Sequence, residues 1–197
     1  MGSASAGGYI NTTEGISGAA HVGDLRRTLA ELACPEKEYG PAPEGPGIVF
    51  DRFSGDLVIN TGSDIAWPDG TAYFHNFVRL GNGKLVVAED DRVDLVIGGA
   101  VRVEGAGFGN DNEAAAALQL WGCGEDDRDW KIEQQGSSWM TIYAPAHRLR
   151  LTGDGVLHGS LLVGELEWVG DGTISYDAKV IDDTPFAKAR GTWVELF

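Results

Sequence analysis

The residues best placed to do chemistry are two aspartates in matching turns. Asp154 and Asp171 each lie between two glycines, in Gly153-Asp154-Gly155 and Gly170-Asp171-Gly172, seventeen residues apart. If the turns stack, the paired carboxylates could serve glycoside hydrolysis or polysaccharide lyase chemistry. An aspartate between glycines is also what a tight turn favours, and Asn82 holds that place in a third copy, Gly81-Asn82-Gly83. The turns therefore predict architecture before they predict catalysis, and we assign no catalytic residue.

A second candidate site is the densest acidic cluster, which runs from Glu125 to Asp129. Carboxylates are the ligands that Ca²⁺ prefers, but the cluster lacks the spaced acidic order of an EF-hand loop. A solvated acidic loop is the competing interpretation. The four histidines show no metal-binding spacing. We therefore expect no metal site and no cofactor, with Ca²⁺ as the one possible exception.

The two cysteines, Cys34 and Cys123, are too far apart in sequence to form a metal-binding motif. Two interpretations stay open. They form one long-range disulfide in an extracellular protein, or they are two buried free thiols. A disulfide would tie the N-terminal segment to the middle of the chain.

The charge of the chain excludes some partners. Thirty acidic residues against fifteen basic ones give a formal net charge of −15. Such a chain repels nucleic acid and anionic membrane surfaces. The surplus suits high-salt or cation-rich surroundings, or simply keeps the protein soluble. No run of about 20 apolar residues and no signal peptide is recognisable, so any membrane attachment would need a segment missing from this chain.

The pattern of residues divides the chain in two. Residues 1–47 read as a leader, a short helix over Asp24 to Ala33 and a linker with four of the seven prolines. Residues 48–197 read as one β domain of short strands. The predicted strands are 48–50, 57–59, 77–80, 84–87, 93–97, 100–103, 131–133, 139–143, 149–151, 161–163, 166–169, 173–176 and 191–197, with 114–120 ambiguous between helix and strand.

Two architectures can use these strands. The 17-residue recurrence favours a parallel β-helix, in which Leu149 stacks on Leu166 and Leu157 on Ile174. The Asn-Gly and Asp-Gly pairs favour hairpins, and hence an antiparallel β-sandwich. We prefer the solenoid.

Six tryptophans lie in the β region. Most large aromatics contribute to a core, but Trp67 and Trp130 stand beside turn or acidic residues and are the best candidates for exposed contacts with a partner or a glycan. Trp193 lies in an apolar C-terminal run that could cap the solenoid or dock to another subunit.

One stretch resembles a known family. Residues 140–177 contain Tyr143-Ala144-Pro145, the two glycine turns with Gly159 between them, and a final Tyr176-Asp177. This order resembles the C-terminal domain of PilX-like and other pilin-like surface proteins of bacteria and archaea. The family's hydrophobic N-terminal helix is absent here, and Ala146 stands where the family usually has Asn.

The resemblance implies a β-helix-like domain at the cell surface, attached to pili or the envelope, without catalytic activity. We therefore expect a structural or adhesive module that is extracellular or envelope-bound. Its partners would be other pilus or envelope subunits, or further copies of itself. The alternative is a β-helix that binds or degrades polysaccharide, with Asp154, Asp171 and an exposed tryptophan lining a groove.

Overall fold

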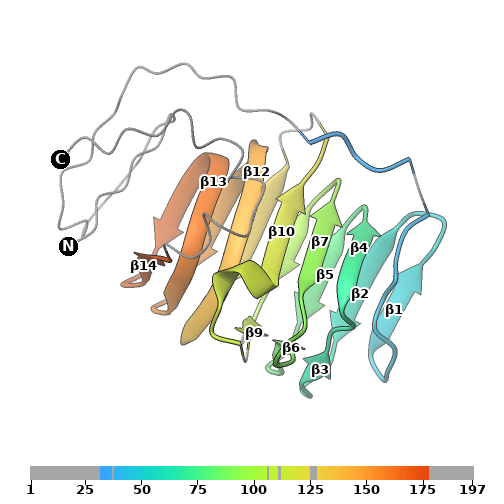
Figure 1. Ribbon diagram of the computed structural model, residues 1–197, viewed down its shortest axis with the longest axis horizontal. Helices are drawn as coiled ribbons and strands as arrows, with labels where there is room; N and C mark the ends of the chain where they lie inside the picture. The colour runs from blue at the N-terminus through green and yellow to red at the C-terminus, as the bar shows by residue number, and fades with distance from the viewer. Residues whose placement is uncertain (1–31, 37, 106, 111, 125–127, 178–197) are drawn as a thin grey trace.

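The computed structural model describes residues 32–36, 38–105, 107–110, 112–124 and 128–177 of the 197-residue chain. Over these residues the chain winds into a β-solenoid of about six turns (Figure 1). Its elements are β1 (Ile48–Asp51), β2 (Asp56–Asn60), β3 (Ile65–Ala66), β4 (Gly70–Phe74), β5 (Phe77–Leu80), β6 (Leu85–Val87), β7 (Val93–Ile97), β8 (Val101–Val103), β9 (Phe108–Asn110), the 3₁₀ helix η1 (Ala115–Ala117), β10 (Leu118–Gly122), β11 (Asp129–Glu133), β12 (Ser137–Thr152), β13 (Val156–Val169) and β14 (Thr173–Tyr176).

Each coil contributes strands to stacked legs. Leg 1 holds β2, β5, β8 and β11, followed by the second halves of β12 and β13. Leg 2 holds β3, β6 and β9. Leg 3 holds β4, β7 and β10, then the first halves of β12 and β13, and finally β14. Neighbouring strands within each leg pair in parallel, as expected for a parallel β-helix.

The core is a set of side-chain ladders inside the coils. Alternate residues of each strand point inward, so residues two apart join neighbouring ladders. One ladder of leg 1 consists of Leu57, Phe77, Val101, Trp130, Leu149 and Leu166. The predicted neighbours Leu149 and Leu166, and Leu157 and Ile174, are indeed in register. This confirms the solenoid prediction over the antiparallel sandwich.

The coils differ in length, and the last ones are the shortest. Val101 pairs with Trp130, twenty-nine residues further along, whereas Leu149 pairs with Leu166 after only seventeen. Leg 2 ends at β9, and the chain then passes from β11 through a short turn into β12. The 17-residue repeat seen in the sequence is therefore a property of the last, two-sided coils.

The N-terminal end of the stack is closed by strands of the opposite direction. β1 pairs with β2 antiparallel, and Gly40 forms an antiparallel bridge with Tyr73 of β4. Ala42, Ile48 and Phe50 pack over the first coil of the core. This is the one antiparallel strand pair among the elements that the structure describes, and it ends the parallel stack.

Several sequence predictions need adjustment. The ambiguous segment 114–120 contains both elements, because η1 leads directly into β10. Strands β3, β4 and β9 were not predicted. Of the predicted helix over 24–33, residues 24–31 lie outside the described ranges, while Leu32 makes a parallel bridge with Cys123. The predicted strand 191–197 also lies outside them.

Candidate functional site

The two glycine turns stack at one corner of the solenoid. The backbone N–H of Asp171 donates a hydrogen bond to Oδ1 of Asp154 at 3.1 Å. Gly153 and Gly170 have φ values of +104° and +129°, and a Cβ on Gly153 would lie 2.4 Å from the carbonyl oxygen of Gln134 in the coil before. Only glycine combines that backbone conformation with so close an approach. The predicted alignment of Asp154 with Asp171 is therefore present, and the Asp154 carboxylate is bound to the next turn.

Other polar turn residues also accept hydrogen bonds from the backbone of a neighbouring coil. In each case a side-chain oxygen accepts a hydrogen bond from a backbone N–H about one coil away in sequence. The pairs are Asp64 with Lys84 (2.7 Å), Asp69 with Arg92 (2.8 Å), Asn76 with Ala100 (2.8 Å) and Asn112 with Asp90 (2.7 Å). Turn N–H groups have no partner within their own strand, so these side chains satisfy them. The turn carboxylates and amides thus join successive coils.

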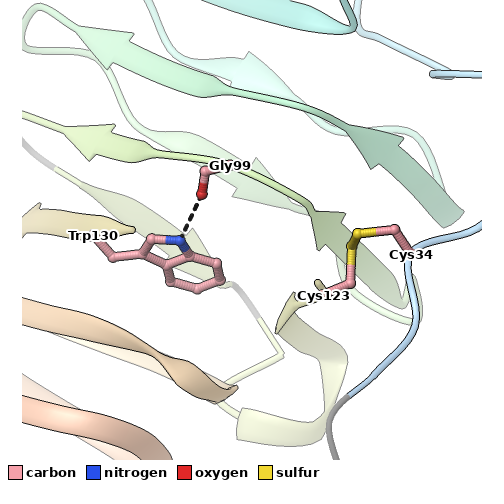
Figure 2. Close-up of a disulfide and its surroundings, with 4 residues drawn as sticks. All are labelled: Cys34, Gly99, Cys123 and Trp130. Carbon is pink, nitrogen blue, oxygen red and sulfur yellow. Dashed lines mark hydrogen bonds between the residues drawn. A yellow bond between two sulfur atoms is a disulfide. The ribbon is translucent and has the colours of Figure 1, made fainter. Parts of the chain in front are cut away.

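Trp67 and Trp130 were the best candidates for exposed contacts, and the structure places both of them in the core instead. Trp67 is 3% exposed and packs edge-on against Phe74 and Phe77, with ring centroids 5.9 Å away in both cases. Trp130 is fully buried, and its indole N–H donates to the carbonyl of Gly99 at 3.0 Å (Figure 2). Both are core residues because they occupy inward positions of leg 2 and leg 1. Trp193 lies outside the described residues.

A different tryptophan lies beside the stacked aspartates. The indole N–H of Trp168 donates to the carbonyl of Gly153 at 3.3 Å, and a Cβ on Gly172 would lie 2.0 Å from the Trp168 ring. Trp168 is half-buried at the last inward position of leg 1. No role for Trp168 was predicted from the sequence, although its spacing of seventeen from Leu151 is the signal that places it in that ladder.

A disulfide joins Cys34 to Cys123, with the two Cα atoms 4.9 Å apart (Figure 2). Of the two interpretations that the sequence left open, a long-range disulfide and two buried free thiols, the structure has the disulfide. Cys34 belongs to a segment, residues 32–36 and 38–42, that we call the strap. The strap bridges Cys123 through Leu32 and Tyr73 through Gly40, so it runs from β10 to β4 along the C-terminal ends of the leg 3 strands (Figure 1).

An apolar cluster lies under the strap, on the outside of the solenoid. Val96, Trp121 and Cys123 are its buried members, and Tyr73 and Tyr143 pack against them. Trp121 and Tyr143 are neighbours in register with ring centroids 5.6 Å apart. Burial raises the pKa of both tyrosines, and for Tyr73 the nearby Tyr39 adds to the effect. Leu32 and Cys34 of the strap pack against this apolar cluster.

The residues of the family-like motif have structural positions. Tyr143 belongs to the outer cluster, Ala144 is fully buried, and Pro145 lies where the pairing register of β12 and β13 shifts between Ala144 and Arg148. That shift is the corner between legs 3 and 1, as expected for a proline that removes a ladder donor. Tyr176 pairs with Gly159 in the last strand and is 59% exposed. Asp177 follows, and its N–H donates to the Gly159 carbonyl at 3.2 Å.

Arg79 is a buried charged residue that was not predicted from the sequence. Arg79 is fully buried at an inward position between Ile59 and Val103. Its guanidinium donates to the corner carbonyls of Leu80 and Gly83. Burial lowers its pKa, and Asp64 opposes that shift. The flanking residues Val78 and Leu80 are apolar, so alternation alone would have assigned the wrong face to this strand.

The candidate Ca²⁺ cluster lies partly outside the structure, because residues 125–127 are not described. Among the residues that are, no group of three or more His, Cys, Asp or Glu side chains is placed to hold a metal ion. The same part of the chain contains no helix with the length and apolar character needed to cross a bilayer.

Comparison with known proteins gives one match. Residues 51–182 match the family described as a domain of unknown function, DUF7305. The chain belongs to the DUF7305 family. The DUF7305 region begins at the end of β1 and contains Cys123, whereas Cys34 and the strap precede it. No curated protein and no solved structure matches the chain.

Proposed function

We propose that this chain is a non-enzymatic structural module of a pilin-like, pilus- or envelope-associated surface protein. The proposal starts from the resemblance of residues 140–177 to PilX-like proteins. The observation that carries it further is the use of the polar turn residues. Asp154 and its counterparts in other turns accept hydrogen bonds from the next coil, so the side chains that could do chemistry instead hold a rod together.

The disulfide supports a place outside the cytosol. Disulfides persist in oxidising surroundings and are rare in cytosolic proteins. Cys34 and Cys123 are the only cysteines of the chain, and they are bonded. A solenoid braced in this way can present a fixed surface without depending on a large core.

The closed N-terminal end offers a surface for docking. Phe53, in the turn after β1, is 99% exposed, and Val49 of β1 is 65% exposed. Exposed apolar side chains on an otherwise charged surface mark contact sites. We place the contact with neighbouring pilus or envelope subunits here.

A co-sedimentation assay tests this function. Filaments sheared from cells that make the full-length protein are mixed with the purified chain and pelleted. We expect the chain to pellet with the filaments, and Phe53→Ser to reduce the bound fraction severalfold. Glu89→Ser, at an exposed site on the side of the solenoid, is the control and should bind normally. No binding by the unaltered chain, or equal loss in both variants, would argue against the proposal.

The alternative function is a β-helix that binds or degrades polysaccharide. One observation supports it: Asp154 and Asp171 stack beside Trp168. A glycan panel screened with the purified chain separates it from the structural role. Binding that disappears in Trp168→Ala, but persists in Phe53→Ser, would favour a carbohydrate-binding or polysaccharide-degrading β-helix. A panel without hits would remove that alternative.

A further inference from the structure

The exposed side chain of Phe53 is carried by a tight loop between β1 and β2. The Asp51 carboxylate accepts hydrogen bonds from the backbone N–H groups of Phe53, at 2.8 Å, and of Ser54, at 3.4 Å. These bonds lower the pKa of Asp51. Gly55 closes the loop, and its N–H donates to the Asp51 carbonyl at 2.8 Å. Asp51 therefore fixes one side of the loop that carries Phe53.

The strap fixes the other side of this loop through Tyr39. Gly55 has a φ of +75°, and a Cβ at that position would overlap the ring of Tyr39. Gly55 is buried, although Phe53 and Ser54 just before it are exposed, because the Tyr39 ring lies against it. Glycine provides both the backbone conformation and the room for that ring. The Tyr39 ring thus contacts the backbone of the loop two residues from Phe53.

Tyr39 is itself held in place by leg 3. Its ring centroid lies 4.8 Å from that of Tyr73 in β4. The next residue, Gly40, exchanges two backbone hydrogen bonds with Tyr73, at 2.7 and 2.9 Å. A Cβ on Gly40 would lie 3.4 Å from the ring of Phe50, so the strap also lies against β1. The strap therefore joins leg 3 to the hairpin of β1 and β2.

We propose that Tyr39 is a positioning residue of the docking surface, and that the strap thereby sets the orientation of Phe53. This role of Tyr39 rests on the proposed function, which places the contact with neighbouring subunits at Phe53. An aromatic side chain on a loop that is already ordered loses less conformational entropy on binding than one on a mobile loop. The strap precedes the DUF7305 region, which begins at residue 51. The docking surface thus combines a loop of the family domain with a segment outside that domain.

Hydrogen exchange on the full chain measures how firmly Tyr39 holds the loop. We expect Tyr39→Ala to speed exchange of the amides of residues 53–56 by about tenfold or more, with β11 and β13 unchanged. Tyr39→Phe keeps the ring against Gly55 and should exchange like the unaltered chain. Glu38→Ala removes an exposed side chain next to Tyr39 and is the matched control. Equal exchange in Tyr39→Ala and the unaltered chain would overturn the proposal.

The filament co-sedimentation assay shows whether this hold matters for docking. We expect Tyr39→Ala to reduce the bound fraction severalfold, as Phe53→Ser does, whereas Tyr39→Phe and Glu38→Ala should bind normally. If Tyr39 acts only through Phe53, the double variant Tyr39→Ala/Phe53→Ser binds no more weakly than Phe53→Ser alone. A further severalfold loss in the double variant would mean that Tyr39 contacts the partner itself, and would overturn the positioning role.

The two measurements separate failure of the positioning role from failure of the proposed function. If the unaltered chain does not pellet with filaments, the proposed function is overturned, and the docking role of Tyr39 with it. If the unaltered chain binds, and Tyr39→Ala speeds exchange in the loop without weakening binding, the positioning role alone is overturned. Faster exchange in the loop together with weaker binding, both restored in Tyr39→Phe, is the result that we expect.

Discussion

The disulfide should be a major source of stability, because it closes a long loop. Cys34 and Cys123 are 89 residues apart in sequence. In the chain-entropy description, a cross-link over a loop of that length stabilises the folded state by about 4–5 kcal/mol. For a chain of this size, that corresponds to a fall in melting temperature of roughly 10–20 °C when the bond is removed.

The perturbation is the double variant Cys34→Ser/Cys123→Ser, followed by thermal and urea unfolding. The unaltered chain with a reducing agent should behave like the double variant, and the reductant should not change the variant further. We also expect Trp121 to become more exposed, since loss of the bond frees the strap that lies over its cluster.

A stabilisation of this size requires that the strap stays on the solenoid until the whole structure unfolds. If the strap already separates from leg 3 in the native protein, closing the loop has little effect on the main transition. A double variant that unfolds within about 1 kcal/mol of the unaltered chain would therefore refute it.

Three further predictions concern the coils. Leu151→Ala removes a completely buried ladder residue and should cost about 2–5 kcal/mol in urea unfolding, whereas Val49→Ala, at a site 65% exposed, should cost under about 1 kcal/mol; similar losses would contradict the inward assignment. Gly153→Ala combines a positive φ with a clash and should destabilise by more than about 2 kcal/mol, while Gly62→Ala, with open space around it, should be within about 0.5 kcal/mol of the unaltered chain. Because the pKa of Tyr73 is raised in the folded protein, its contribution to stability is complete below the ordinary tyrosine pKa of about 10 and is lost as the pH rises beyond it. Tyr73→Phe should make unfolding less sensitive to pH between about 10 and 12, and an unchanged alkaline profile would count against the burial of this phenol.

The last coils of the fold could be predicted from the sequence, and the early coils could not. Gly153 and Gly170 reveal a repeat because the final coils have equal length and the same corner geometry. The earlier coils include leg 2 and differ in length, so the same corner recurs at irregular intervals. Gly81, matched from the sequence as a third copy of the turn, does belong to that corner, but its distance from Gly153 follows no regular repeat.

The side-chain environments were harder to predict than the strands. Trp130 stands next to an acidic run that suggested exposure, yet its spacing of two from Ile132 indicates an inward ladder position. Arg79 left no usable signal, because its guanidinium satisfies corner carbonyls that exist only once the coil has closed. For the turn aspartates, sequence could give the alignment but not the acceptor role toward the next coil.

The central claim is that this solenoid is a structural part of a surface filament or envelope assembly. The most direct measurement is to shear cells, isolate their surface filaments and probe every fraction for the native, full-length protein. The account predicts that the protein is recovered with the filaments or the envelope. Recovery of the protein in the cytosol, or free in the medium with none on filaments, would contradict it.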